Sequence, residues 1–275
     1  MKRVDVPEFE DSPRCPGWLR DALTRLIRVL SRTMGFDEAV ANVLKPALRS
    51  TGCREVLDMG SGAGGIMPEV LAALRSGDDA IPEATLTLSD RFPNRAAIET
   101  YAGDAVPGMR YRTEPLDATR LEEVPPGMKT MVNSFHHLSP EVARSVLASA
   151  HASRTPILIF ELADNRLPFW LWVLTLPLGL ALVFCIAVLM TPRVRPLTAR
   201  QLLFTFVVPI IPLLYAWDGQ ASYPRIYGEG DLEELTRGLD QDYTWTVGTG
   251  KTTAGKTAGF YLLGMPGAAD LATSA

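Results

Sequence analysis

The sequence of 275 residues contains only three cysteines and three histidines. Cys15, Cys53 and Cys185 are scattered and odd in number, so they predict neither a disulfide framework nor a paired metal-ligand spacing. The histidines form no HExxH pattern and do not pair with cysteines at zinc spacing. We therefore predict a reducing compartment and no metal site.

An excess of positive charge is also missing. The formal net charge is −4 and the sequence pI is about 5.5, whereas phosphate neutralisation needs a dominant basic face. We therefore do not expect nucleic acid as a partner. The N-terminus, MKRVDVPEFEDSPRCPG, has acidic residues and prolines in place of the apolar run of a signal peptide, which predicts that the protein is not exported.

Two helical patterns precede the first predicted strand. From Trp18 to Met34, apolar residues recur at helical spacing while arginines occupy mostly other faces. A second helical stretch runs from Phe36 to Leu48. We predict that residues 1–50 form an N-terminal helical cap. This cap would cover the core, act as a substrate lid, or rest its basic face on an anionic membrane.

Short apolar runs then alternate with helical patterns up to residue 160. Strands spaced by helices of this length predict βαβ units and a parallel sheet, so we expect an α/β fold. A helix and two strands joined by a polar, Gly-rich loop end the chain. The predicted strands are Glu55–Met59, Thr85–Ser89, Met109–Arg112, Thr130–Asn133, Pro156–Phe160, Tyr243–Val247 and Phe260–Leu263, and the predicted helices are Ile66–Arg75, Asn94–Ala102, Pro140–Ala150 and Glu229–Leu239.

An apolar insertion, residues 165–227, interrupts this pattern. Leu167–Met190 carries no charged residue over a length that would cross a bilayer at about 1.5 Å per residue. Leu202–Trp217 is shorter and is broken by two prolines. A spanning hairpin would place the arginines between the two runs on the far side, against the positive-inside bias. We favour an insertion that embeds in the cytoplasmic leaflet or forms a lid, while a spanning hairpin, a buried core or a dimer contact stays open.

A glycine-rich turn links the first predicted strand to the next helix in EVLDMGSGAGGIMPEVLAAL. Glycines let backbone N–H groups and a helix N-terminus approach an anionic ligand. The spacing fits both the dinucleotide pattern GxGxxG and the methyltransferase pattern GxGxG, so the glycines alone do not choose a cofactor. The glycines are Gly60, Gly62, Gly64 and Gly65.

Two acidic residues near this turn help to distinguish the cofactors. Asp58 ends the strand, where a carboxylate suits a ligand with an ammonium group and a sulfonium cation and would repel a pyrophosphate. Asp90 closes the next strand and can accept both ribose hydroxyls, a role shared with nicotinamide folds. The helix and two strands that follow the fifth parallel strand also favour methyl transfer. A dehydrogenase, by contrast, usually carries its glycine loop near the N-terminus.

VLDMGSGAGG resembles motif I of the class I S-adenosylmethionine-dependent methyltransferases, and Asp90 falls where that family keeps its ribose-binding acid. EPLDATRLEEVP resembles the segment whose acid contacts adenine, MVNSFHHLSPE the fourth-strand motif, and PILIFE the fifth strand. The resemblance covers roughly residues 54–161 and, more weakly, 228–264. It implies S-adenosylmethionine as cofactor and a subgroup with a hydrophobic insertion after the fifth strand.

The resemblance also implies a Rossmann-like, mostly parallel sheet of seven strands with helices on both faces. The methyltransferase domain would comprise residues 51–164 and 228–268, with the apolar insertion between strands 5 and 6. The expected cofactor-binding residues are Asp58, Gly60, Ser61, Gly62, Gly64, Asp90, Arg91, Asp117, Ala118 and Asn133.

Three side chains at the carboxyl edge of the predicted sheet are candidates for chemistry. Methyl transfer from a sulfonium can proceed by positioning and desolvation, but a histidine suits a hydroxyl or protonated amine acceptor. His136 and His137 follow the fourth strand, and because adjacent residues tend to point apart, we expect only one to face the methyl group; a structural role for both stays open. Glu161 ends the fifth strand and either meets the substrate or pairs with an arginine.

The apolar insertion suggests the acceptor. We expect methyl transfer to a hydrophobic small molecule or lipid, at the cytoplasmic side of a membrane, with Asp218 and Arg225 at the rim of the acceptor pocket. Asn133 begins NSFH where the family often has DPPY or NPPY, which argues against amino-group methylation of nucleobases or glutamine. The alternatives are a non-catalytic Rossmann-fold membrane-associated protein and a nicotinamide-dependent oxidoreductase.

Overall fold

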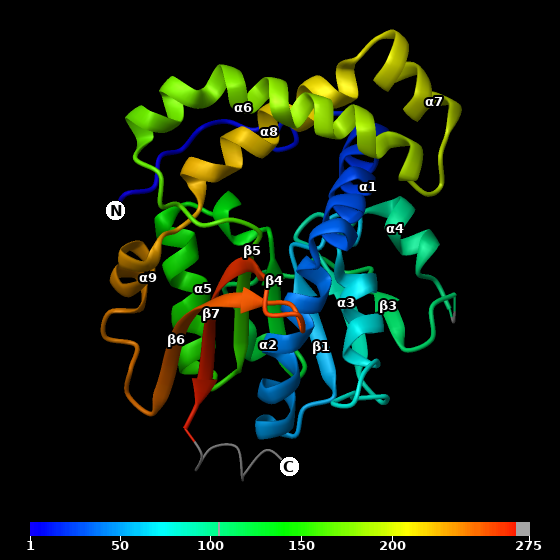
Figure 1. Cartoon of the computed structure of the whole chain (residues 1–275). Coiled ribbons are helices and arrows are strands. Elements are labelled where there is room, and N and C mark those ends of the chain that lie inside the picture. Colours follow the sequence, from blue (N-terminus) through cyan, green and yellow to red (C-terminus); the bar gives the residue numbers. More distant parts are fainter. Residues whose placement is uncertain (104, 268–275) are drawn as a thin grey trace. The chain divides into compact units, whose positions relative to one another are not determined.

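The structure is a computed structural model that describes residues 1–103 and 105–267 (Figure 1). It divides into two compact units. The sheet unit contains Met1, Gly35–Ala163 and the chain from Glu229 onward, and the helical unit contains Lys2–Met34 and Asp164–Gly228. The expected end of the catalytic domain at residue 268 lies outside the described residues.

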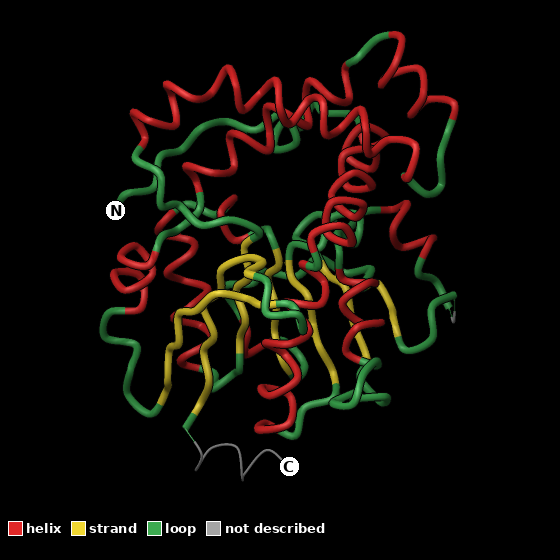
Figure 2. Tube along the Cα trace, viewed as in Figure 1, coloured by secondary structure: helices red, strands yellow, loops and turns green. Residues whose placement is uncertain are grey.

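The sheet unit is built on seven strands in the order β3-β2-β1-β4-β5-β7-β6. Figure 2 shows the strands in yellow, side by side between helices. The first five strands are parallel, whereas β7 runs antiparallel to both β5 and β6. The predicted, mostly parallel sheet of seven strands is therefore confirmed. The strands are β1 (Glu55–Met59), β2 (Thr85–Ser89), β3 (Met109–Tyr111), β4 (Met128–Val132), β5 (Ile157–Glu161), β6 (Tyr243–Lys251) and β7 (Thr257–Pro266).

Helices cover both faces of this sheet. The connections through α3 and α4 run from β1 towards β3, while the connection through α5 runs the opposite way, from β4 to β5. Because parallel crossovers are right-handed, α3 and α5 must lie on opposite faces. The helices of this unit are α2 (Phe36–Thr51), α3 (Met67–Leu74), α4 (Arg95–Thr100), α5 (Pro140–Ala152) and α9 (Glu229–Thr236).

The expected N-terminal cap of residues 1–50 is not one element, because its two helices fall in different units. Gly35, at φ 76°, separates them. Helix α2 is tied to the β6–β7 hairpin: Asn42 Nδ2 donates to the carbonyl oxygen of Lys251 at 3.0 Å, and Glu38 Oε1 accepts from the N–H of Thr253 at 3.0 Å. These long-range hydrogen bonds make α2 part of the sheet unit.

The helical unit consists of α1 (Gly17–Met34), α6 (Phe169–Met190), α7 (Ala199–Leu202) and α8 (Ile210–Arg225), with a π-helical turn at Leu203–Val207. The chain bends by 79° between Ala199–Val207 and α8. By length and composition α6 could cross a membrane, and the bent pair would be a second span if counted as one. The three long helices share a small core that contains Leu19, Leu23 and Leu26 of α1, Ala187 and Met190 of α6, and Ile211 and Tyr215 of α8.

Two charged residues of α8 hold the N-terminal segment. The Asp218 carboxylate accepts from the backbone N–H groups of Phe9 and Glu10 at 2.7 and 3.2 Å. The buried Arg225 guanidinium pairs with Glu8 at 2.9 Å and with Asp11 at 2.6 Å. Since these partners belong to the segment before α1, the two side chains act as its anchors in the helical unit, and their expected place at the rim of an acceptor pocket stays a prediction.

Candidate functional site

The carboxyl edge of the sheet has a switch point between β1 and β4. The chain places β2 and β3 on one side of β1 and places β4 and β5 on the other. Open α/β sheets bind ligands outside the carboxyl ends of strands at such a point. The loops that follow β1 and β4 are joined here, because Ser134 Oγ donates to the carbonyl oxygen of Met59 at 3.3 Å. Both segments singled out from the sequence therefore lie together at this edge of the sheet.

The glycine loop after β1 fits closely against its own unit. Gly60 has φ 72°, and a Cβ there would lie 3.1 Å from Ser134 Oγ. Gly64 has φ 98°, and a Cβ there would lie 2.9 Å from Tyr101 Oη. At Gly62, by contrast, a Cβ would meet no described atom within 4 Å. The loop is thus wedged at Gly60 and Gly64 and open at Gly62 and Gly65, where a ligand can come close to the backbone.

Asp58 lies beneath this loop and is only 2 % exposed. Its Oδ1 accepts from Thr130 Oγ1 at 2.7 Å and its Oδ2 from Ser61 Oγ at 2.6 Å. Burial raises the pKa of the Asp58 carboxyl to about 7, although the hydroxyl hydrogen bonds of Ser61 and Thr130 oppose this shift and nearby Asp90 adds to it. Asp58 braces the loop, and its expected contact with a cationic ligand stays a prediction.

Asp90 follows β2 and connects the end of this strand to the glycine loop. Its Oδ2 accepts from the N–H of Gly62 at 2.9 Å and its Oδ1 from the N–H of Phe92 at 2.8 Å. Each carboxylate oxygen has a second lone pair with which it can accept from a ribose hydroxyl. The position of Asp90 beside the glycine loop fits the expected role in nucleoside binding.

The segment after β3 reaches the same edge, because the N–H of Leu116 donates to the carbonyl oxygen of Asp90 at 3.0 Å. The next residue, Asp117, is exposed and accepts from the Thr119 hydroxyl at 2.7 Å. That hydrogen bond, together with the Thr119 N–H and the Arg91 guanidinium, lowers the pKa of Asp117. Ala118 is half-buried. The adenine contact expected of this segment stays a prediction.

Asn133 follows β4 with a left-handed backbone, φ 54°, and its N–H donates to the carbonyl oxygen of Phe160 at 2.7 Å. Non-glycine residues in this region are uncommon and cluster at functional sites. The turn that begins at Asn133 continues into a short 3-10 helix, Phe135–His137. The strained residue thus starts the segment that carries both candidate histidines.

His136 and Glu161 form a buried pair in the sheet unit. Glu161 Oε2 lies 2.7 Å from His136 Nδ1, and Glu161 Oε1 accepts from the His136 backbone N–H at 3.0 Å. One carboxylate therefore holds both the ring and the main chain of the histidine. Sequence reasoning expected Glu161 to meet the substrate or an arginine, and in this structure its partner is His136.

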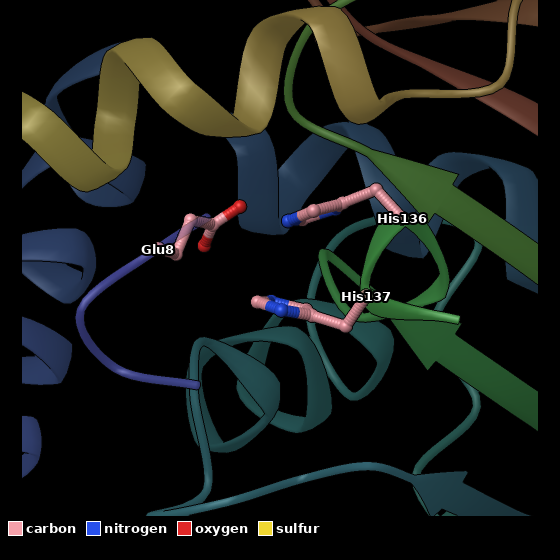
Figure 3. A group of neighbouring side chains, drawn as sticks. All are labelled: Glu8, His136 and His137. Carbon is pink, nitrogen blue, oxygen red and sulfur yellow. The ribbon is translucent and has the colours of Figure 1, made fainter. Parts of the chain in front are cut away.

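His137 lies beside His136, with the ring centroids 4.2 Å apart and the rings tilted by 33° (Figure 3). Its ring is half-buried, whereas that of His136 is buried. The two rings leave the same short helix and lie side by side, so they do not point in opposite directions as expected for adjacent residues. A 3-10 turn rather than an extended strand carries them, which explains the difference.

Sequence reasoning missed the residues that support the loop from neighbouring strands. Thr130 faces Asp58 because these two residues are register partners in β4 and β1. Ser89 donates from Oγ to the carbonyl oxygen of Asp58 at 2.7 Å. Tyr111 donates from its hydroxyl to the carbonyl oxygen of Gly62 at 2.9 Å. Strand order was the missing information, since small hydroxyl residues in strands give no signal of their own.

Comparisons with known proteins address the fold. No protein-family model matches the sequence, and no curated protein matches it. Among solved structures, the plantazolicin methyltransferase BpumL in complex with SAH superposes with a TM-score of 0.51 at 13 % identity, covering 91 % of this chain and 98 % of that one. This likeness confirms the fold of class I methyltransferases.

Two further solved structures are similar. An O-methyltransferase family protein from Burkholderia thailandensis gives a TM-score of 0.48 at 17 % identity, covering 90 % of this chain and 59 % of that one. An O-methyltransferase family 2 protein from Planctomyces limnophilus, in complex with apigenin, gives 0.49 at 15 % identity, covering 92 % and 63 %. This chain therefore spans less than two thirds of the length of these two proteins.

Proposed function

We propose that this protein is an S-adenosylmethionine-dependent methyltransferase that acts on a hydrophobic small molecule at a membrane surface. One observation carries the proposal. The glycine loop after β1 and the buried His136–Glu161 pair lie together at the switch point of a methyltransferase-type sheet. The solved neighbour with SAH has the same fold, which supports the choice of cofactor.

The residues at the carboxyl edge of the sheet fit this cofactor. The missing side chain of Gly62 leaves space for a ligand beside the loop, and Asp90, which holds the Gly62 N–H, lies there as a hydrogen-bond acceptor. A carboxyl group at Asp58 can favour a nearby cation once it is ionised. When bound, S-adenosylmethionine supplies a methyl group on a sulfonium that leaves as a neutral thioether. The chain must then position the acceptor and exclude water.

The His136–Glu161 pair can accept a proton from the acceptor. With Nδ1–H donated to Glu161 Oε2, the neutral imidazole has its lone pair on Nε2. Nε2 can remove the hydroxyl proton as the acceptor oxygen attacks, and the Glu161 carboxylate then stabilises the imidazolium. The second hydrogen bond, to the His136 backbone, fixes the ring relative to the strand end. An oxygen acceptor is the acceptor class that this arrangement favours.

Cofactor binding tests the proposal directly. Titration calorimetry with S-adenosylmethionine, S-adenosylhomocysteine and NAD should show binding of both sulfur nucleosides and none of NAD. Binding of NAD alone would favour the oxidoreductase alternative. If the folded protein bound none of the three, the methyltransferase proposal would be wrong. Binding of S-adenosylhomocysteine without methyl transfer to any lipid extract would favour a non-catalytic protein.

The pKa of Asp58 gives a pH prediction for cofactor binding. Because burial raises this pKa to about 7, the carboxyl of the free protein is protonated at lower pH, and a cationic ligand must displace that proton to gain an ionised partner. We expect the affinity for S-adenosylmethionine to fall by up to about tenfold per pH unit below pH ~7 and to level off above it. Calorimetry across this pH range measures the affinity, and the affinity of Asp58→Asn should not change with pH. If the affinity of that variant still fell with pH as in the wild type, Asp58 would not be the group that causes the pH dependence.

Membrane association is proposed for the helical unit because α6 exposes a large apolar surface. Trp170 is 68 % exposed and Leu178 is 74 % exposed, and monomeric soluble proteins rarely leave such residues in one contiguous patch. The segment Asp164–Gly228 follows β5 directly in the chain, which supports a hydrophobic acceptor. The exposed large apolar residues of α6 are Phe169, Trp170, Val173, Leu174, Leu178, Leu182 and Leu189.

We propose that α6 lies in one leaflet and does not span the bilayer. Its last turns, at Ala187 and Met190, pack in one core with α1. Helix α1 carries Arg20, Arg25, Arg28 and Arg32, so a spanning α6 would draw these charges towards hydrocarbon. An interfacial position buries the exposed apolar side chains of α6 and leaves the arginines at the level of the headgroups.

Two charges placed on this face should prevent membrane binding. Leu178→Glu combined with Leu182→Glu changes exposed positions, so the fold should be retained, while each leucine forfeits about 1.5–3 kcal/mol of burial in lipid. We expect vesicle partitioning, measured by flotation, to fall more than about tenfold. Ser145→Glu, an exposed position of α5 in the sheet unit, is the matched control and should bind vesicles like the wild type. Equal flotation of all three proteins would contradict membrane docking through α6.

A further inference from the structure

The helical unit contains a pocket, lined by five polar or charged residues among seven, that the proposed methyl transfer does not use. The pocket has a volume of about 210 Å³ and lies between α1 and the segment that begins α7. Within it, Arg200 lies over the Trp18 ring, with its guanidinium carbon 5.1 Å from the ring centroid. This stacking orients a guanidinium that can still donate in its own plane. The pocket is lined by Trp18, Asp21, Ala22, Arg25, Thr198, Arg200 and Gln201.

Gln201 indicates that the pocket receives a polar ligand. Its side chain is 1 % exposed, yet neither the amide oxygen nor the amide nitrogen has a hydrogen-bond partner among the described residues. A buried amide without partners costs free energy, so such a residue in a native fold calls for a ligand that satisfies it. The backbone N–H of Gln201 is already bound by Thr198 Oγ1 at 3.0 Å, which fixes the residue at the start of α7. Gln201 is also one of the residues that line the pocket, so a polar ligand bound there can supply the partner that its amide lacks.

The charged side chains of the pocket favour an anionic ligand that also carries a hydrogen-bond donor. Arg25 and Arg200 provide two guanidinium groups, and Asp21 provides one carboxylate. The resulting charge of +1 matches a phosphodiester, which carries a single negative charge and accepts from guanidinium groups. The Asp21 carboxylate would repel a second negative charge but would accept a hydroxyl of the same ligand. A phosphodiester attached to a hydroxylated group satisfies all three side chains.

The surroundings of the pocket indicate that this phosphodiester belongs to a lipid. The chain leaves Gln201 directly into an exposed apolar segment, in which Phe206 is 52 % exposed and Val207 is 71 % exposed. The helical unit carries twelve Lys and Arg against seven Asp and Glu, a formal charge of +5. The rest of the chain carries −9, since the whole chain carries −4. Positive charge beside apolar surface favours an anionic membrane over a free anion.

We propose that this pocket is a headgroup site for an anionic phospholipid with a hydroxylated headgroup. Arg25, Arg200 and the Gln201 amide bind the phosphodiester, Asp21 accepts from the headgroup hydroxyl, and the acyl chains follow the apolar segment after Gln201. The proposal specifies the lipid partner of the membrane association proposed above. It does not depend on the activity of the sheet unit, because the pocket is lined only by residues of the helical unit.

The test uses a short-chain phosphatidylglycerol below its micelle concentration, titrated into the full-length protein by calorimetry. We expect saturable binding of one lipid per chain, and much weaker binding of the matching phosphatidylcholine and of inorganic phosphate. Arg25→Gln combined with Arg200→Gln should weaken binding of phosphatidylglycerol at least about tenfold, because two charge-assisted hydrogen-bonding groups are lost. Arg193→Gln combined with Arg195→Gln removes the same charge outside the pocket and should leave monomer binding unchanged.

Gln201→Leu separates a built site from diffuse attraction. This change keeps the net charge and replaces an amide without partners by an apolar side chain, so the melting temperature should stay the same or rise. Binding of phosphatidylglycerol should nevertheless weaken several-fold. Unchanged lipid binding in both pocket variants, or equal binding of phosphatidylcholine, would overturn the proposal, and binding of inorganic phosphate as tight as that of the lipid would reassign the pocket to a free anion. Titration of S-adenosylhomocysteine into the same samples tests the methyltransferase proposal separately.

Discussion

His136→Ala is expected to lower turnover by about 10²–10⁴-fold on a hydroxyl acceptor while leaving the affinity for S-adenosylmethionine nearly unchanged. The reason is the pairing of His136 Nδ1 with Glu161 Oε2 at 2.7 Å, which favours the tautomer in which Nε2 is the basic nitrogen. Steady-state kinetics with a labelled methyl donor, together with calorimetry of cofactor binding, would separate the two effects. The substrate would first be identified by methyl-label transfer into a lipid extract.

Glu161→Gln tests whether the carboxylate acts through the histidine. The amide can keep one hydrogen bond to His136 but cannot stabilise an imidazolium, so turnover should fall and the acid limb of the pH–rate profile should move. His151→Ala changes a histidine in the last turn of α5, beside Tyr243 at the start of β6 and away from the carboxyl ends of the parallel strands; it is the control and should change turnover little. Equal losses in His136→Ala and His151→Ala, or no loss in either, would show that His136 is not the base.

Asp90→Ala should weaken binding of S-adenosylhomocysteine by about 10- to 100-fold, because hydrogen bonds to a charged group contribute about 1.5–3 kcal/mol each. The variant loses the acceptor for the N–H of Gly62 and, on our proposal, the acceptor for the ribose. Calorimetry provides the measurement. Glu99→Ala removes an exposed carboxylate from nearby α4 and should bind the nucleoside like the wild type. If Asp90→Ala bound S-adenosylhomocysteine like the wild type, the nucleoside would not bind at the end of β2.

Local patterns predicted the elements of the sheet unit well. The strands Glu55–Met59 and Thr85–Ser89 have the predicted bounds, because short apolar runs between turn signals are read from neighbouring residues alone. The β6 strand is longer than predicted and continues to Lys251. The composition of its Gly- and Thr-rich end predicts a loop, but pairing with β7 supplies the hydrogen bonds that this composition does not indicate.

The candidate site was predicted as a set of positions but not as a set of contacts. The sequence indicated Asp58, Asp90 and His136 because each follows or ends a predicted strand, where α/β sheets bind ligands. It did not indicate that Asp58 would be buried beneath the loop, which depends on Thr130 of β4 lying beside β1. Nor did it indicate that Glu161 would hold His136, a pairing across 25 positions of the chain.

The amino-acid sequence by itself determined the α/β class, the glycine loop and the apolar character of the segment after β5, since each depends on residues close together in the chain. The tertiary structure decided which side chains meet. Strand order brought the loops after β1 and β4 together, long-range packing divided the two N-terminal helices between the units, and the fold of the helical unit placed Arg25 and Gln201 in one pocket. Such pairings depend on how distant segments satisfy their hydrogen bonds and bury their apolar faces, which no local pattern records.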